Sequence, residues 1–125
     1  MSVWRQKAIA CLPEFKRDIE QRETSIYEVF SYLLSAVVDS HKNNDVERLR
    51  LLYGYAEWCY RQKEKDLWNA AGVAFYEHLG DQIETRECMA QWVKYDIYKE
   101  VRGLLELQVD ERILQEIDKN YRAAL

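Results

Sequence analysis

The sequence of 125 residues has the length of one domain, with 48% hydrophobic and 32% charged residues, which excludes a disordered chain. A formal net charge of -4 argues mildly against nucleic acid as the partner, because phosphate binding uses clustered Lys and Arg. No apolar run approaches the roughly 20 residues that span a bilayer, and the N-terminus lacks an apolar signal core. We therefore expect a cytoplasmic protein that does not bind or cross a membrane.

The three cysteines are widely spaced and odd in number, which fits reduced thiols in a cytosol. We interpret Cys11, Cys59 and Cys88 as small core residues. No paired CxxC or HExxH spacing is present, so we expect neither a metal nor a cofactor.

Helical periodicity dominates the whole chain, and Gly (4) and Pro (1) are scarce. The first apolar stripe runs from Trp4 to Ile19 and contains Pro13, which predicts a helix break near Leu12. Ser25 with Glu28 forms a capping-box pattern and predicts a second helix that ends near Ser40. Asn44 followed by Glu47 repeats the same capping pattern and predicts the start of a third helix.

The third helix is predicted over residues 45–61 and carries two apolar stripes. The broad stripe includes Leu49, Leu52 and Ala56, and the second lies nearly opposite, with a polar strip between them. A helix that is apolar on two sides either lies at the centre of a fold or presents one side to a partner. The second stripe consists of Leu51, Tyr55 and Trp58; the polar strip consists of Arg50, Gly54, Glu57 and Arg61.

A fourth helix is predicted from Asp66 to Gly80 and is apolar nearly all round, with small residues around Gly72 that allow close helix packing. A fifth is predicted over about 85–106, and a last one follows Asp110. These patterns predict an all-α fold, a compact bundle of five or six mostly antiparallel helices in a single domain over residues 1–125.

Glu77 and His78 are the polar residues that stand out in the fourth helix. Glu77 either has a partner inside the bundle or lies at a binding cleft, since an unpaired buried carboxylate is costly. His78 lies near Asp81 and Glu84, and a histidine among carboxylates can act as a general base or metal ligand. We favour the structural interpretation for both residues.

Catalytic motifs are missing from the sequence. There is no GxSxG elbow, Walker loop or GxGxxG, and four glycines leave little for a phosphate-binding loop. We therefore expect a protein that is not an enzyme.

The aromatic content, with 9 Tyr and 4 Trp, is the feature that favours protein binding, because these residues are enriched at interfaces. The candidate partner-binding residues lie off the main core stripes. The alternative for each of them is packing on a neighbouring helix. The candidates are Leu51, Tyr55, Trp58, Trp92 and Tyr95.

Three segments carry a resemblance to a known group of proteins. They are Trp4 with Leu12-Pro13-Glu14-Phe15, the segment from Leu67 to Leu79 (LWNAAGVAFYEHL), and Trp92-Val93-Lys94-Tyr95. The chain resembles small bacterial helical proteins that are similar to immunity proteins encoded beside polymorphic (Rhs-type) toxin genes. These segments are packing motifs, so the resemblance transfers no functional residue.

The resemblance implies a stoichiometric inhibitor that binds a toxin domain without turnover. Acidic residues at the rim of the interface would speed the capture of a basic toxin. Two other classes stay open: a homo-oligomeric helical scaffold or adaptor (a homodimer, for example), and a small-molecule-binding bundle or enzyme that uses Glu77 and His78.

Overall fold

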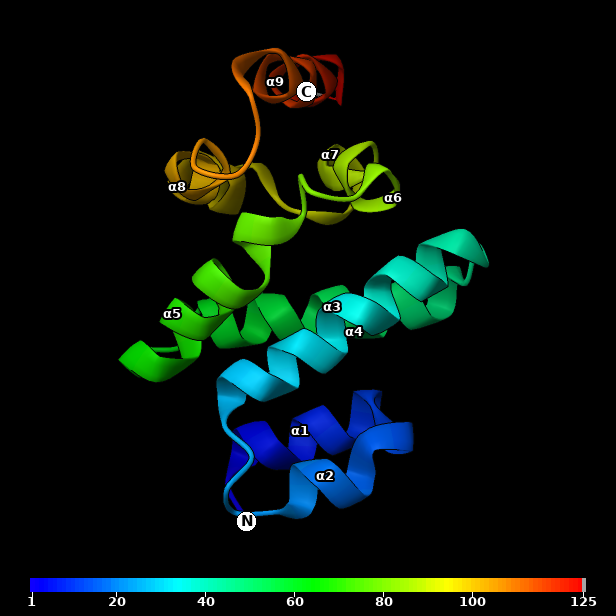
Figure 1. Ribbon diagram of the computed structural model, residues 1–125, viewed down its shortest axis with the longest axis vertical. Coiled ribbons are helices and arrows are strands. Elements are labelled where there is room, and N and C mark those ends of the chain that lie inside the picture. Colours follow the sequence, from blue (N-terminus) through cyan, green and yellow to red (C-terminus); the bar gives the residue numbers. More distant parts are fainter. Residues whose placement is uncertain (125) are drawn as a thin grey trace.

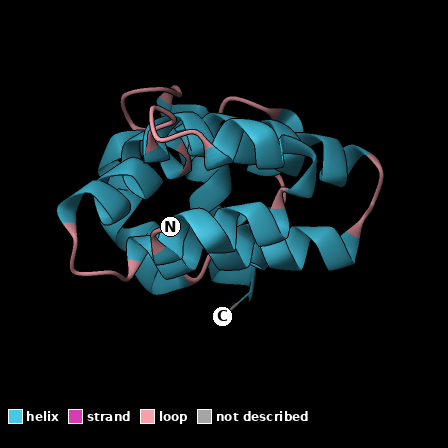
Figure 2. Cartoon of the chain, turned by 90° about the horizontal axis from the view of Figure 1, so that it is seen from below, coloured by secondary structure: helices cyan, strands magenta, loops and turns pink. Residues whose placement is uncertain are grey.

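The structure, a computed structural model, describes residues 1–124, and all of these residues lie in helices, turns or loops (Figure 2). The predicted all-α class is confirmed. The described chain contains nine α-helices and two 3₁₀ helices: α1 (Val3–Cys11), η1 (Pro13–Phe15), α2 (Lys16–Glu20), α3 (Ile26–Lys42), α4 (Val46–Tyr60), α5 (Lys65–Ala74), η2 (Tyr76–His78), α6 (Ile83–Arg86), α7 (Met89–Trp92), α8 (Tyr95–Leu105) and α9 (Glu111–Ala124).

The helices are stacked along the long axis of the molecule (Figure 1). Helices α1 and α2 lie side by side at one end, and α3 crosses in front of α4 in the middle, next to α5. Helices α6, α7 and α8 form the next level, and α9 covers the other end. No helix within residues 1–124 has the length and apolar character needed to cross a membrane.

The core runs through the whole stack and is centred where α3, α4 and α5 meet. The Phe75 ring lies 6.0 Å from Phe30 and 5.8 Å from Tyr53, measured between ring centroids. Phe30, Leu52 and Phe75 are fully buried. Each such side chain stabilises the fold by about 1.5–3 kcal/mol relative to exposure, so this aromatic centre joins the three helices.

Several predicted helix ends are confirmed. Ser25 caps α3, and its hydroxyl accepts a hydrogen bond from the Glu28 amide at 3.2 Å. The break at Leu12 separates α1 from the 3₁₀ turn that begins at Pro13. Asp110 accepts a hydrogen bond from the Ile113 amide at 2.9 Å just before α9.

The N-cap of α4 is Asp45, one residue later than the Asn44 that the sequence pattern predicts. Its side chain accepts a hydrogen bond from the Arg48 amide at 3.2 Å. Asn44 instead adopts a φ of 53°, the left-handed conformation that asparagine tolerates better than most residues. It therefore turns the chain between α3 and α4.

The predicted continuous helix from Asp66 to Gly80 is wrong. Helix α5 begins at Lys65 and ends at Ala74, and Phe75 leaves helical geometry with φ −128° and ψ −73°. Gly80 does not have a positive φ; its role is spatial, because a Cβ at this position would lie 2.8 Å from Val109 Cγ1. The glycine lets the chain pass close to the segment before α9.

The helix predicted over 85–106 is also interrupted, at Cys88 and again at Val93 and Lys94. A side chain from a distant segment satisfies the backbone at these breaks. The Tyr121 hydroxyl donates hydrogen bonds to the Val93 carbonyl oxygen at 2.7 Å and to the Met89 carbonyl oxygen at 3.1 Å. These breaks raise the number of helices in residues 1–124, so the predicted bundle of five or six helices is not confirmed.

Candidate functional site

A groove of about 390 Å³ opens between α1 and α4, within the size range of roughly 300–1,000 Å³ typical of ligand sites. It brings together two segments that are about 40 residues apart in sequence. We call it the α1–α4 groove. It is lined by Lys7, Ala10, Cys11, Arg50, Leu51, Gly54, Tyr55 and Trp58.

Helix α4 forms one wall through residues three or four positions apart, which lie on the same helix face. Leu51 is 61% exposed, and Trp58 is half-buried. Gly54 lies between them, and a Cβ added there would meet no packed atom within 4 Å. The sequence predicted Leu51 and Trp58 as partner-binding residues, and the structure brings them together in this groove.

Tyr55, the third residue of that predicted stripe, is only 5% exposed, so it forms part of the floor and is not a free surface residue. Its hydroxyl donates a hydrogen bond to the Trp4 carbonyl at 2.9 Å, and its ring lies 5.9 Å from that of Phe30. Burial raises the pKa of Tyr55 far above its usual value, so the hydroxyl remains a neutral donor. Tyr55 thus holds α1 against α4.

The thiols near the groove are not reactive groups. Cys11 lines the groove but is buried, and burial raises the pKa of its thiol to about 11. Burial likewise raises the pKa of Cys59 to about 12. Because the thiolate is the nucleophile, both side chains act as small apolar residues near neutral pH, as the sequence predicted.

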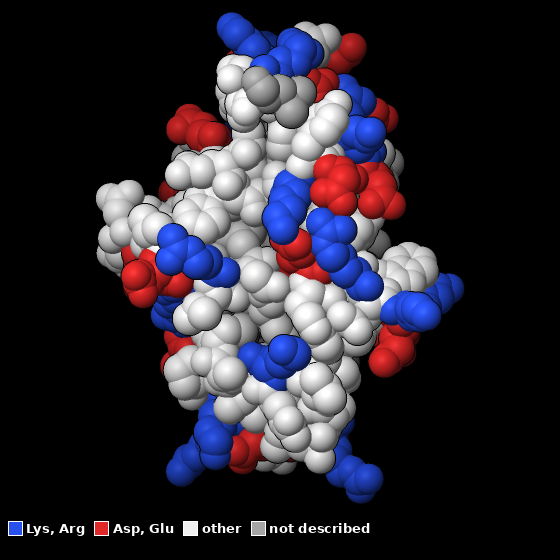
Figure 3. All heavy atoms as spheres, turned by 180° about the vertical axis from the view of Figure 1, so that it is seen from behind, with Lys and Arg blue, Asp and Glu red and all other residues white. Residues whose placement is uncertain are grey.

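The charged residues of the groove are both basic. Lys7 places its ammonium nitrogen 5.0 Å from the centroid of the Trp58 ring, and Arg50 is exposed on α4. Within residues 1–124 neither side chain forms an ion pair. On the side opposite to that of Figure 1, the middle of the lower half is largely uncharged with Lys or Arg at its centre, and charged side chains of both signs lie around its edge (Figure 3).

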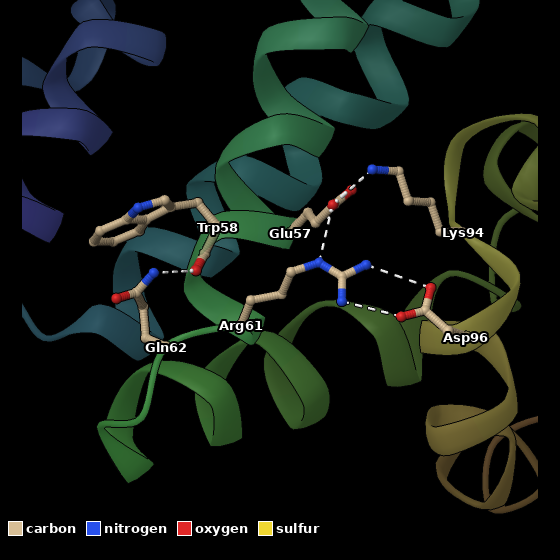
Figure 4. A network of polar contacts seen from close by, with 6 residues as sticks. All are labelled: Glu57, Trp58, Arg61, Gln62, Lys94 and Asp96. Carbon is tan, nitrogen blue, oxygen red and sulfur yellow. Dashed lines mark hydrogen bonds and ion pairs between the residues drawn. The ribbon is translucent and has the colours of Figure 1, made fainter.

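On the other side of α4, a polar network ties this helix to the start of α8 (Figure 4). Arg61 contacts Asp96 at 3.0 Å and Glu57 at 3.0 Å, and Lys94 contacts Glu57 at 2.9 Å. Trp58 points away from this network toward the N-terminal helices. Arg61 and Lys94 are thus engaged in the network, whereas the two groove cations, Lys7 and Arg50, form no ion pair within residues 1–124.

The pKa values in this network follow from the hydrogen bonds. Burial alone would raise the pKa of Glu57, but hydrogen bonds from Lys94 and Arg61 lower it overall. Hydrogen bonds from Arg61 also lower the pKa of Asp96. Both groups are therefore ionised carboxylates at neutral pH, in a structural role.

Trp92 and Tyr95, the other predicted partner-binding residues, lie apart from the groove, beside a second hollow near α9. Trp92 stacks on Tyr53 with ring centroids 5.4 Å apart and an interplanar angle of 11°. This stacking is the alternative that the sequence left open for Trp92. Tyr95 is 44% exposed, with Lys99 over its ring at 5.4 Å.

Glu77 and His78 contact each other, with His78 Nε2 3.5 Å from Glu77 Oε2, but they do not line the same hollow. Glu77 accepts a hydrogen bond from the Gln108 side chain at 3.2 Å, which gives it the partner that a largely buried carboxylate requires. His78 Nδ1 lies 3.0 Å from Asp81 Oδ2, and His78 lines an open hollow beside α3 that Glu77 does not line. Within residues 1–124 no group of three His, Cys, Asp or Glu residues is arranged to hold a metal ion.

Sequence reasoning missed the contribution of α1, because periodicity does not show which helices pack together. Nothing in the sequence marks Lys7 or Ala10 as surface of a groove, and Arg50 and Gly54 belong by spacing to the polar strip of α4. A glycine in the middle of a helix costs about 1 kcal/mol relative to alanine, and that cost was the available signal at Gly54.

The chain matches the family model described as "Domain of unknown function (DUF7674)" over residues 5–108, and it therefore belongs to this family. The matched residues include all eight residues that line the α1–α4 groove and end before α9. No curated protein and no solved structure matches the chain.

Proposed function

We propose that this chain is a non-catalytic protein-binding domain that holds its partner in the α1–α4 groove. The observation that carries the proposal is the groove itself, which exposes Leu51 and part of Trp58 around an unfilled space at Gly54. Tryptophan is among the residues that contribute most to binding energy, especially where it lies in a pocket surrounded by apolar neighbours.

Helix propensity supports the same proposal. Gly54 is less favourable than alanine in the middle of α4, and no packed neighbour within the chain requires the small residue. A partner that approaches the α4 backbone closely would explain why a glycine occupies this position. Gly103 in α8 is equally open, but it does not line this groove and serves as a matched control.

The partner that we propose is a toxin domain, with this chain as its immunity protein. The proposal rests on the resemblance to immunity proteins of polymorphic toxin systems and on the small, acidic, aromatic-rich character of the chain. A stable interface needs about 800 Å² per partner, which is available on a molecule with 7397 Å² of accessible surface. Binding alone would occlude the toxin, without turnover.

The test is to co-express the chain with the product of a neighbouring toxin gene. We expect the wild type to restore growth and to form a 1:1 complex in size-exclusion chromatography. The Gly54→Gln variant places a long side chain in the groove and should abolish both effects, whereas Gly103→Gln should preserve them. Equal rescue by both variants would exclude the groove as the binding site. Failure of the wild type with every adjacent gene product would refute the immunity function.

A further inference from the structure

We infer that the α1–α4 groove accepts an acidic amphipathic helix of a partner protein. This inference rests on the proposed function and names the chemistry of the segment that binds. The local charge of the groove is opposite in sign to the net charge of -4 of the whole chain, so it cannot be read from the composition.

The charge of the segment follows from the lining. None of the eight lining residues is acidic, and two are basic: Lys7 from α1 and Arg50 from α4. Glu14, a carboxylate whose charge acts on Cys11 in the groove, is itself paired with Arg48. Carboxylates that flank the apolar side chains of a ligand would therefore find two cations, one on each wall, that form no ion pair with the described part of the chain.

The backbone of the groove indicates the conformation of the segment. Both walls are α-helices, so their amide and carbonyl groups are used within the helices and offer no edge for an added strand. A ligand that buries its backbone there must satisfy its own hydrogen bonds, and a helix does so.

The surface between the two cations provides the apolar contacts. Leu51 and Trp58 are two turns apart on α4, and Gly54 between them lets a ligand helix approach the α4 backbone closely. Val3, one turn before Lys7 on α1, is 59% exposed and extends the apolar surface. Apolar side chains at positions i, i+3 and i+7 of a ligand helix match this spacing.

The probe that tests the inference is a displayed library of helical peptides about 14 residues long, roughly the length of α4. Leucine is fixed at i, i+3 and i+7, and the flanking positions are varied among Glu, Lys and Gln. We expect selection on the wild-type protein to enrich Glu. Binding of the selected peptides should fall at least tenfold with Gly54→Gln and stay unchanged with Gly103→Gln.

Charge variants make the inference specific. Lys7→Gln and Arg50→Gln should each weaken the Glu-flanked peptides about two- to fivefold, with a smaller loss at high salt. The double charge reversal, Lys7→Glu with Arg50→Glu, should select Lys-flanked peptides instead.

The outcomes separate this inference from the proposed function. Peptides that are sensitive to Gly54→Gln but enriched in Lys, or without charge preference, would refute the acidic ligand and leave the groove as a docking site. Failure to select any peptide sensitive to Gly54→Gln would refute helix docking, while rescue from a toxin remains a separate measurement. Self-association in sedimentation that Gly54→Gln abolishes would make a second copy the occupant and overturn the inference.

Discussion

The ammonium nitrogen of Lys7 lies 5.0 Å from the centroid of the Trp58 ring, so one cation–π contact spans the α1–α4 groove from wall to wall. Such contacts contribute about 0.5–1 kcal/mol at exposed sites. Lys7 therefore covers part of the indole in the free protein and also leaves a positive charge at the groove opening.

Replacement of two glycines by alanine should have opposite effects on stability. At Gly54 a Cβ meets open space, so Gly54→Ala should raise the free energy of unfolding by about 0.5–1 kcal/mol through helix propensity. At Gly80 the Cβ would lie 2.8 Å from Val109 Cγ1, so Gly80→Ala should lower it by about 1–3 kcal/mol. Urea denaturation of both variants checks the pair, and a loss of stability for Gly54→Ala would show that the α1–α4 groove is closed in solution.

The position of Gly72 in α5 should tolerate a small side chain but not a large one. An added Cβ would lie 3.5 Å from Leu104 Cδ1, an ordinary contact, so Gly72→Ala should be tolerated. Gly72→Leu adds three more carbons against a residue that is buried, and we expect a loss of about 1–3 kcal/mol or more. Thermal denaturation of the two variants side by side tests this, and equal melting temperatures would place Gly72 at the surface.

Local signals in the sequence predicted the N-terminal half of the fold well and the C-terminal half less well. The cap at Ser25 and the break before Pro13 are encoded within a few residues, so both are confirmed. The breaks at Phe75 and Val93 have no glycine or proline to mark them. A break at Val93 is stable because Tyr121, 28 residues away, bonds the freed carbonyl, and that contact exists only after folding.

In the candidate site, too, the sequence predicts what one helix encodes locally and misses what depends on contacts between helices. Leu51 and Trp58 could be predicted because both lie off the core stripe of a single helix. Tyr55 shares their stripe, but its hydroxyl reaches the Trp4 carbonyl across 51 residues and the ring becomes buried. The packing of α1 on α4 thus divides one stripe into a floor and a wall, and periodicity within α4 does not contain that division.

His41 gives the stability a pH dependence above the range in which carboxylates titrate. Burial lowers the pKa of His41 below its usual 6.5, opposed by the charge of Glu84. The unfolded chain therefore binds a proton more readily than the folded chain, and the stability contribution of His41 is complete above pH 6.5 and is lost as the pH falls through the folded pKa. Glu57 and Asp118, whose pKa values are also lowered, contribute only near and below their usual values of 4.5 and 3.8.

In the wild type we expect the urea concentration at the unfolding midpoint to decrease as the pH is lowered from about 7.5 to about 5.5. In His41→Gln it should decrease less over the same pH range. Glutamine can still bond the Tyr53 hydroxyl, which lies 2.8 Å from His41 Nε2 in the wild type. An identical pH slope in the two proteins would show that His41 is not the titrating group.

The two tryptophans that the sequence grouped as partner-binding residues should behave differently. Trp92 stacks on Tyr53 and contacts the His41 ring edge-on, with centroids 6.5 Å apart, so Trp92→Ala should lower the free energy of unfolding by about 3 kcal/mol. Trp58 contacts Tyr55 and Lys7 at the edge of the α1–α4 groove. Because less of its packing is lost, Trp58→Ala should lower the free energy of unfolding by about 1–2 kcal/mol.

Partner binding should be affected in the reverse order, with a larger loss for Trp58→Ala than for Trp92→Ala. As the aromatic anchor of the groove, Trp58 is expected to contribute about 2 kcal/mol or more to partner binding, roughly a thirtyfold change in affinity. Trp92→Ala, compared at matched concentrations of folded protein, should leave the affinity unchanged. Calorimetric titration and chemical denaturation of the same two variants measure both quantities. If Trp58→Ala binds like the wild type while Trp92→Ala does not, the binding surface lies near α7 and α9, and our assignment of the groove is wrong.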